Sequence, residues 1–388
     1  MLALAVFWAS AAALAYTWLG YPALLRMLAR RAAPLAAKGS RAPDVSVIIA
    51  AFNEARCIAA KLDSTLGAQR YPAERLEAIV VSDGSTDATD ALVAAYADRR
   101  ARLIRQEPRS GKSPALNRGV AAARGEVLVF TDANALFGPD AIARLAAPFA
   151  DPEVGLVSGQ GLYADAAADA RVAASGYVRY EAAIKDGESA LGFLASADGA
   201  IYAIRRSLYR DLAASQVNDL LHPIQAALAG YRCRFDGDAY TVEPPSGSGA
   251  QEFRRHVRII AQGMHLLRCW LPALIRARRW RAVWMLASHR ILRWASAFFL
   301  VGALLASAAL HDRAPLYGLA FVTQLAFYAL AAAGLAAERL GARLGALALP
   351  YFFCTVCLAG VAGFARFVRG GAEAVWSPAG QAVPGRAA

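Results

Sequence analysis

The stretch Glu126-Val-Leu-Val-Phe-Thr131-Asp132-Ala133-Asn134 decides how the middle of this chain folds. Residues 127–131 are apolar and β-rich, and Gly125 and a polar turn bound them, which predicts a buried strand. That strand delivers Asp132 and Asn134 to its carboxyl end, the edge at which open α/β sheets bind ligands. Oxygen-bearing side chains there suit a hard divalent cation already bound to a diphosphate. Asp and Asn are also common turn residues, so the stretch alone leaves both interpretations open.

Strands and helices alternate on both sides of this stretch, with short connections between them. That alternation predicts an α/β fold with a mostly parallel sheet and helices on both faces. The other expected strands are Val45–Ala50, Leu76–Val81, Arg102–Gln106, Val154–Ser158, Ala195–Ile204 and Tyr231–Val242. The later expected helices are Asp169–Leu191 and Asn218–Ala229, the second with Gly230 as its C-cap.

Acidic residues follow three successive strands of the predicted sheet. Glu54, Asp83 and Asp132 each stand at or just beyond a strand end. Because the carboxyl ends of parallel strands meet at one edge, we expect these side chains to form one site. Lys112 and later arginines are cations that can contact phosphate oxygens directly.

The two ends of the chain are much more apolar than its middle, and the mean hydropathy is +0.34. Leu2 to Leu25 carries no charge and is long enough to span a bilayer as a helix. Arg26 and further basic residues follow, so the positive-inside rule places the start of the chain outside and the middle in the cytoplasm. Three more spanning candidates are Trp294–Leu310, Tyr317–Ala337 and Leu344–Phe367.

Other classes of protein fit the composition poorly. The net charge of +12 comes mostly from arginines beside the apolar ends, as in membrane proteins that face an anionic leaflet. No basic stripe with base-stacking aromatic residues is present, so a nucleic-acid partner is not expected. The five cysteines form no set with metal-ligand spacing.

Six short motifs, in this order and spacing, resemble those of membrane-bound glycosyltransferases of family 2. That family has the GT-A fold, a Rossmann-like and mostly parallel sheet, and includes synthases of the hyaluronan and poly-N-acetylglucosamine type. The resemblance covers about Val45 to Gly263. The motifs are Ser46-Val-Ile-Ile-Ala-Ala-Phe-Asn53-Glu54, Ser82-Asp83-Gly84-Ser85-Thr86-Asp87, Gly111-Lys112-x4-Asn117-Arg118-Gly119, Thr131-Asp132-Ala-Asn134, Asp198-Gly199-Ala-Ile-Tyr202-Ala-Ile-Arg205 and Asn218-Asp219.

The resemblance implies a role for each matching residue. Asp219 matches the general base that activates the acceptor hydroxyl, and Asp198 and Gly199 match the acceptor side. Asp132 and Asn134 match the motif, usually Asp-x-Asp, that holds Mg²⁺ or Mn²⁺ and the diphosphate. The donor-binding residues implied are Asn53, Glu54, Asp83, Lys112, Asp132, Asn134, Arg255 and Arg258.

Three departures from the family pattern affect these expectations. Asn134 replaces a carboxylate in the metal motif, and Asn218 replaces an acid beside the base. Arg255-x-x-Arg258-Ile259 stands where the family has Gln-x-x-Arg-Trp, a motif associated with processive synthases. Two alternatives therefore stay open beside single transfer: a processive polysaccharide synthase coupled to export, and a non-catalytic membrane subunit that binds nucleotide sugar.

We therefore expect an inverting glycosyltransferase that moves a sugar from a nucleotide-diphosphate donor, most simply UDP-linked, to a lipid-linked or polysaccharide acceptor. Expected partners are these two substrates, membrane lipid and proteins of polysaccharide assembly or export. The expected location is a bacterial inner membrane, with a multi-pass chain and a cytoplasmic catalytic domain.

The expected domains are a transmembrane helix at 1–27, a linker at 34–43, a GT-A domain at 44–262, an interfacial segment at 263–293, about three transmembrane helices at 294–368 and a tail at 369–388. The GT-A domain divides into a nucleotide-binding half, 44–135, and an acceptor half, 136–262. One span before the domain and three after it would put the tail outside, whereas Arg366 and Arg369 favour the cytoplasm.

Overall fold

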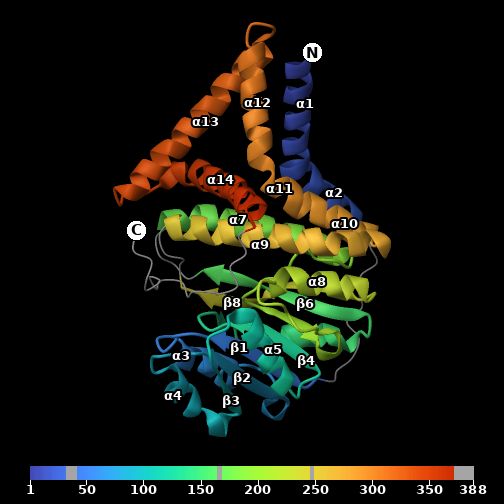
Figure 1. The fold of residues 1–388 in the computed structure, drawn as a ribbon, viewed down its shortest axis with the longest axis vertical. Helices are drawn as coiled ribbons and strands as arrows, with labels where there is room; N and C mark the ends of the chain where they lie inside the picture. Colours follow the sequence, from blue (N-terminus) through green and yellow to red (C-terminus); the bar gives the residue numbers. More distant parts are fainter. Residues whose placement is uncertain (32–41, 164–167, 245–248, 371–388) are drawn as a thin grey trace.

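The computed structural model describes residues 1–31, 42–163, 168–244 and 249–370. Most of the linker predicted at 34–43 and most of the tail predicted at 369–388 lie outside these ranges. A sheet domain occupies one end of the molecule and long apolar helices occupy the other (Figure 1). Helices α7 (Ala168–Ala190) and α9 (Gly249–Arg276) lie between the two parts.

Within the described residues, one sheet has eight strands in the order β3-β2-β1-β4-β7-β6-β8-β5. The first four run parallel to one another, whereas β7 is antiparallel to both of its neighbours and β5 is antiparallel to β8. The mostly parallel α/β sheet predicted from the sequence is thus confirmed. The strands are β1 (Val45–Ala51), β2 (Leu76–Asp83), β3 (Ala101–Gln106), β4 (Val127–Asp132), β5 (Leu136–Phe137), β6 (Val154–Tyr163), β7 (Tyr202–Arg205) and β8 (Arg232–Glu243).

One predicted strand is wrong in its extent. We expected a strand over Ala195–Ile204, but β7 begins only at Tyr202. Before it, the backbone N–H of Ala200 donates to Asp198 Oδ1 at 3.2 Å, which folds Asp198-Gly199 into a turn. The turn brings this acidic residue to the carboxyl edge of β4, because β7 runs antiparallel to β4.

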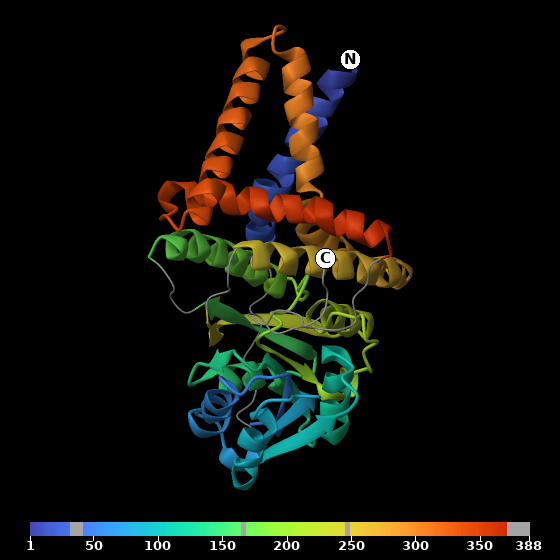
Figure 2. The ribbon, with the colours of Figure 1, turned by 60° about the vertical axis from the view of Figure 1, so that its left-hand side comes forward.

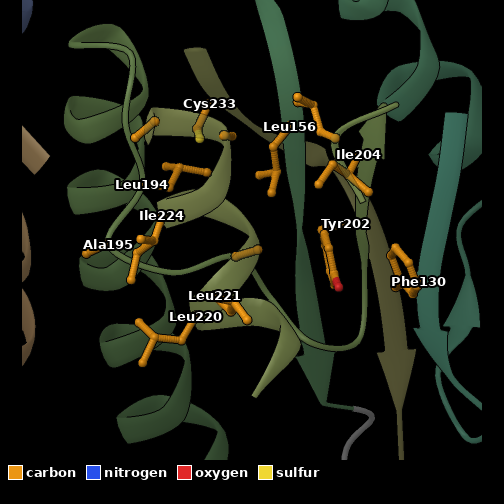
Figure 3. Close-up of a cluster of buried hydrophobic side chains, with 14 of the residues drawn as sticks. Phe130, Leu156, Leu194, Ala195, Tyr202, Ile204, Leu220, Leu221, Ile224 and Cys233 are labelled. Atoms are coloured by element: carbon orange, nitrogen blue, oxygen red, sulfur yellow. The ribbon is translucent and has the colours of Figure 1, made fainter. Parts of the chain in front are cut away.

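Alternate residues of each strand face two hydrophobic cores. On β1, Ile48 packs into one core, whereas Val47 and Ile49 pack into the other. Helices α5 (Lys112–Ala122) and α8 (Asn218–Leu228) cover the first face. Figure 3 shows Leu221 of α8 on the side of the sheet residues Leu156 and Tyr202, whereas Leu220 and Ile224 lie on the opposite side of that helix. Helices α3 (Ile58–Leu62), α4 (Thr89–Ala94) and α6 (Ala141–Ala146) belong to the second face.

Helix α9 runs across the predicted domain boundary. The boundary was placed between residues 262 and 263, yet α9 continues through that point without a break. It then leads to α10 (Trp280–Leu286) and α11 (Leu292–Trp294), where an interfacial basic segment was predicted. The amphipathic pattern therefore extends further toward the N-terminus than residue 263.

By length and composition, three helices within the described residues can cross a membrane: Leu2–Ala29, Pro315–Arg339 and Gly345–Val368. The first contains α1 (Leu2–Ala15) and α2 (Tyr21–Ala29), and the second is α13. A fourth candidate is the pair Trp280–Trp294 and Ser296–Leu310, which is bent by 57°. The second member of that pair is α12 (Ser296–Leu310).

Helix α14 (Ala348–Val368) is oriented differently from the other apolar helices. It runs alongside α9 and across the direction of α12 and α13 (Figure 2). A Cβ added at Gly363 would lie 2.7 Å from Ile260 Cγ2 of α9, so this glycine permits the close contact. The predicted span at Leu344–Phe367 has the required composition, but its position is that of a helix on the sheet-domain side of the bundle.

A buried polar cluster joins the apolar helices to the sheet domain. Tyr21 Oη donates to Glu188 Oε1 at 2.6 Å, and His289 Nδ1 lies 2.8 Å from the same oxygen. Arg293 forms an ion pair with Glu181, which lies further toward the start of α7. Because breaking a buried charge pair is strongly destabilising, these contacts fix the apolar helices against the sheet domain.

Candidate active site

The strand register brings the predicted acidic residues together at one edge of the sheet. Ala50 of β1 pairs with Asp132 of β4 on one side, and Ala51 pairs with Ser82 of β2 on the other. Asp83 and Glu54 therefore stand at or just beyond the carboxyl ends of the two strands that precede β4 in the sheet. The site begins at this edge, as the sequence predicts for a parallel sheet.

Asp83 is held almost entirely by the chain itself. Its side chain is 3% exposed, and its carboxylate accepts hydrogen bonds from Gln106 Nε2 at 2.6 Å, Ser110 N at 2.8 Å and Gly111 N at 2.9 Å. A carboxylate has about four lone-pair positions, so most of its capacity is used. Asp83 thus fixes the loop that leads to Lys112, and its predicted contact with the donor stays a prediction.

Asn53 and Glu54 shape the loop after β1. Asn53 has φ +54°, a region that Asn tolerates better than most residues, and its Oδ1 accepts from Thr86 N at 2.8 Å. The Glu54 backbone N–H donates to Thr89 Oγ1 at 2.8 Å. Burial raises the pKa of the Glu54 carboxyl, and nearby Asp132 adds to that shift. These contacts join the first two motifs into one wall of the site.

Lys112 and Asp132 form the central ion pair. Lys112 begins α5, and its Nζ donates to Asp132 Oδ1 at 2.5 Å. Their side chains are 24% and 29% exposed, so the pair is accessible from solvent. A cation therefore already lies beside the carboxylate that was predicted to bind a metal.

Lys61 contacts the residues on either side of the Asp132-Ala-Asn134 motif, and the sequence analysis did not predict it. Its side chain is fully buried, donates to Thr131 Oγ1 at 2.7 Å and also contacts the carbonyl oxygen of Ala135. Burial holds the pKa of Lys61 well below its usual range, while the charges of Asp132 and Glu243 act in the opposite direction. Lys61 fixes the backbone on both sides of Asp132-Ala-Asn134.

Asp219 is the carboxylate best placed to accept a proton. It lies in the first turn of α8, and its Oδ1 is buried without a hydrogen-bond partner among the described residues. Burial raises its pKa, Lys112 and Arg290 lower it, and Asp198 raises it again. A Cβ at position 199 would lie 3.1 Å from Asp219 Oδ2, so Gly199 leaves room for this carboxylate.

Asn218 has a clear reason to be an amide. Its Nδ2 donates to Tyr202 Oη at 2.7 Å, and His222 Nδ1 lies 2.9 Å from the same oxygen. Burial lowers the pKa of His222 to about 3, which keeps the imidazole neutral. This buried neutral network fixes the start of α8 and therefore the position of Asp219.

Asp198 is well held on the acceptor side predicted for it. Its Oδ2 accepts from Gly161 N at 3.0 Å and lies 3.5 Å from Lys185 Nζ. Arg290 donates to the Ser196 hydroxyl near the same turn. Lys185 and Arg290 were not predicted, because they lie far from the motifs in sequence and no local signal marks them.

Of the two arginines of α9 that were predicted to bind the donor, Arg255 has a contact that places it at the site. Arg255 Nη1 donates to Tyr163 Oη at 3.0 Å, and its charge acts on Glu243. Arg255 thus brings helix α9 to the edge of the site. Arg258 follows it three residues later on α9, and its role toward the diphosphate stays a prediction.

Glu243 is the acidic residue that the sequence analysis missed. It ends β8, one residue beyond the predicted end of that strand. Burial raises its pKa to about 7, and the charges of Asp132 and Asp198 add to the shift. Searching for an acid directly after every predicted strand would have found it.

The oxygen atoms at this edge suit a hard divalent cation. Asp132, Asn134 and Glu243 supply carboxylate and amide oxygens, the ligand types that Mg²⁺ and Mn²⁺ prefer. Across the described parts of the chain, however, no three His, Cys, Asp or Glu side chains gather closely enough to hold a metal ion alone. A cation at this edge therefore needs further ligands, which diphosphate oxygens would supply.

Comparison with known proteins agrees with this geometry. Residues 46–212 match the family described as glycosyl transferase family 2. A solved mannosyltransferase from Pyrobaculum calidifontis, PcManGT, in complex with GDP-Man and Mn²⁺, superposes with a TM-score of 0.69. It is 25% identical, and the match covers 94% of this chain and 99% of that chain. Residues 46–212 of this chain therefore belong to a family 2 glycosyltransferase domain, and its fold is GT-A.

Curated relatives match only in part. The succinoglycan biosynthesis protein ExoO of Rhizobium meliloti (strain 1021) is 38% identical over 105 residues, 27% of this chain and 29% of that protein. The beta-monoglucosyldiacylglycerol synthase of Nostoc sp. (strain PCC 7120 / SAG 25.82 / UTEX 2576) is 32% identical over 119 residues, 30% of this chain and 25% of that protein. The matched segments thus span less than a third of these relatives.

Proposed function

We propose that the protein transfers a sugar from a nucleoside-diphosphate sugar to an acceptor hydroxyl, with inversion at the sugar. The observation that carries the proposal is the buried Oδ1 of Asp219, which has no hydrogen-bond partner among the described residues. The charges of the Lys112–Asp132 pair act on this carboxylate. Asp219 follows shortly after residues 46–212, which match family 2. A raised pKa makes a carboxylate a stronger base, provided that it is ionised at the working pH.

The side chains divide the chemistry between them. A hydroxyl that attacks the anomeric carbon gains acidity as the new bond forms, and Asp219 takes its proton. The bond from the sugar to the diphosphate breaks, and the diphosphate leaves as an anion. Lys112 and Arg255 provide positive charge for that anion. A divalent cation, held by Asp132 and Asn134, would supply further charge stabilisation when bound.

The nucleotide of the donor is the first unknown that experiment can settle. The sequence resemblance favours a UDP-linked sugar, whereas the solved mannosyltransferase was bound to GDP-Man. A tight ligand raises apparent stability by mass action, so the right nucleotide raises the melting temperature most. Scanning UDP, GDP and their sugars with Mn²⁺ would identify the donor.

A lipid-linked acceptor fits the position of the site best. Asp198 lies 3.5 Å from Lys185 of α7. Helix α8, which carries Asp219, lies on the side of the sheet domain nearest α7 and α9, and the apolar helices pack beyond these two (Figure 1). The Nostoc relative is named as a synthase of a glycolipid, which supports the same acceptor class. Transfer of labelled sugar into an organic-phase product would support this, and label found only in soluble polymer would contradict it.

We propose that α1, α12 and α13 cross the membrane and that α9 and α14 lie at its cytoplasmic surface. Helix α14 runs beside α9 in both views, whereas the N-terminus and the α12–α13 connection lie at the opposite end (Figures 1 and 2). One span before the domain and two after it return the chain to the catalytic side. Arg366 and Arg369 then obey the positive-inside rule, and a reporter fused after Pro378 tests the placement.

Removal of the metal tests the catalytic proposal directly. With the donor identified, purified protein in nanodiscs should transfer sugar with Mn²⁺ and lose transfer in EDTA. Re-addition of Mn²⁺ in excess should restore the rate, which separates metal removal from unfolding. Full transfer in EDTA would overturn the metal requirement, and no transfer from any nucleotide sugar would overturn the enzymatic proposal.

A further inference from the structure

We propose that Glu243 supplies a second carboxylate to the divalent cation that binds with the donor diphosphate, where Asn134 provides none. This inference rests on the proposed function. It adds a residue of the β8 end, far from the Asp132-Ala-Asn134 motif in sequence, to the donor site.

Strand pairing places Glu243 beside the motif. The short strand β5 follows Asn134 closely and pairs antiparallel with β8, with Leu136 opposite Val242. One step further along this register, Glu243 lies opposite Ala135. A residue at the end of β8 is therefore a neighbour of the motif through the sheet itself, without any loop between them.

Most of the Glu243 side chain is buried at the site, and its carboxylate has no hydrogen-bond partner among the described residues. Glu243 is 9% exposed, and within those residues no hydrogen bond or ion pair engages its carboxylate. A Cβ added at Gly161 would lie 3.5 Å from Glu243 Oε1 and 3.2 Å from Asp198 Oδ1, so both carboxylates face the same small space. A carboxylate on a largely buried side chain has lost part of its contact with water, and a bound cation would supply a favourable partner.

The charges around Glu243 favour a cation as the missing partner. Asp132 and Asp198 are the acidic groups that act on it, and Lys112 and Arg255 are the opposing cations. Lys112 already pairs with Asp132, and Arg255 already donates to Tyr163. Asp132 and Asp198 form ion pairs with Lys112 and Lys185. Within the described residues no cation forms an ion pair with Glu243, although the charges of Lys61, Lys112 and Arg255 act on it.

Glu243 also accounts for the amide at position 134. A cation with two carboxylate ligands and diphosphate oxygens is better neutralised than one with Asp132 alone. The Asp132-Ala-Asn134 motif contributes one carboxylate, and Glu243 brings the second from the adjacent strand. The two carboxylates and Asn134 still leave positions for the diphosphate, in keeping with a cation that arrives together with the donor.

The test measures Mn²⁺ affinity rather than turnover. Free Mn²⁺ is followed by electron paramagnetic resonance during titration of the full-length protein with UDP or GDP present. Glu243→Gln should weaken Mn²⁺ binding about tenfold or more, because one charged ligand is lost. The matched control is Asp238→Asn, on the same strand with its side chain 77% exposed, which should bind Mn²⁺ as the wild type does.

Rescue makes the assignment specific. Adding Asn134→Asp to the Glu243→Gln variant returns a carboxylate to the site and should restore most of the affinity. In EDTA, Glu243→Gln should melt no lower than the wild type, because the substitution removes repulsion from Asp132 and Asp198. A clearly lower melting temperature in EDTA would show a structural role and overturn the proposal.

Four other outcomes are decisive. Wild-type Mn²⁺ affinity in Glu243→Gln would overturn the assignment, as would failure of Asn134→Asp to restore binding. Retained Mn²⁺ affinity with weaker binding of the intact nucleotide sugar would place Glu243 on the sugar and also overturn it. Absence of any Mn²⁺-dependent nucleotide binding in the wild type would overturn the proposed function first, and the inference with it.

Discussion

Two aspartates of the same site show how differently a carboxylate can be used. Asp83 is 3% exposed and accepts hydrogen bonds from Gln106, Ser110 and Gly111. Asp219 is partly exposed, yet its Oδ1 is buried and has no hydrogen-bond partner in the part of the chain that the structure describes. The first carboxylate organises a loop, whereas the second keeps its basicity for a substrate. Identity and position at a sheet edge do not separate these roles, but their hydrogen bonds do.

The largest expected effect comes from removing the carboxylate of Asp219. Asp219→Asn should lower the rate of sugar transfer by about 100-fold or more, because the acceptor hydroxyl loses its base. Nucleotide binding should change little and the melting temperature should not fall, since the amide has the same shape and carries no charge. Asp211→Asn, an exposed change in the preceding loop, is the control. Near-normal transfer by Asp219→Asn would show that Asp219 is not the base and would contradict the contrast with Asp83.

The next effect tests the Lys112–Asp132 pair. Asp132→Asn should weaken Mn²⁺-dependent nucleotide binding by at least about 30-fold, because truncating one partner of a charge pair costs about 2 kcal/mol or more. Isothermal titration with and without EDTA measures the change. If the loss were equal in EDTA, Asp132 would act only through Lys112 and not through a metal.

Replacing Asp83 should lower stability, whereas replacing Asp219 should lower activity. Asp83→Ala leaves three buried donors without an acceptor, so unfolding should need about 2 kcal/mol less and the melting temperature should fall by about 4–8 °C. Asp63→Ala, whose side chain is 57% exposed, should shift it by less than about 1 °C. Scanning fluorimetry in detergent checks both. Unchanged stability in Asp83→Ala would show that its hydrogen bonds do not hold the loop.

The smallest expected effect is on pH dependence. Because burial raises the pKa of Asp219, transfer should be lost as pH falls through a midpoint above the ordinary value of 3.8. The groups that act on it are Lys112, Arg290, Asp198 and Asp132. Arg290→Gln removes a positive charge and should move the midpoint to higher pH. A pH–rate profile measures this, and a midpoint at or below 3.8 would contradict the burial of the base.

The same shift has a consequence for stability. The folded state holds the Asp219 proton more tightly than the unfolded state, so the unfolded chain releases that proton first as pH rises. Asp219 therefore lowers the free energy of unfolding as pH rises through the window above 3.8. Asp219→Asn should remove that part of the slope of stability against pH.

Local pattern was sufficient to predict the sheet and to place Glu54, Asp83 and Asp132 at one edge of it. The apolar run at Val127–Asp132 and the turn residues after β1 and β2 are strong local signals, and their strands pair in parallel as expected. Asp198-Gly199 was placed in a strand because its apolar neighbours resemble one. The hydrogen bond from the nearby backbone to the Asp198 side chain made a turn instead.

The remaining site residues depend on contacts that no local pattern encodes. Lys61 is buried beneath the motif only because β4 and α3 pack together, and Glu243 reaches the motif only through the β5–β8 pairing. The position of α14 is a similar case, since composition alone qualifies it to span a membrane. Its packing on α9 through Gly363 is one observation behind our proposal that α14 lies at the membrane surface.

The most direct test of the central claim is transfer of labelled sugar by purified protein in nanodiscs, measured side by side for the wild type and Asp219→Asn. Nucleotide sugars that raise the melting temperature serve as donors, and a membrane lipid extract supplies the acceptor. We predict Mn²⁺-dependent label in the organic phase for the wild type, and a loss of about 100-fold or more in the variant with nucleotide binding retained. Equal transfer by the two proteins, or none by the wild type with any donor that binds, would contradict the account.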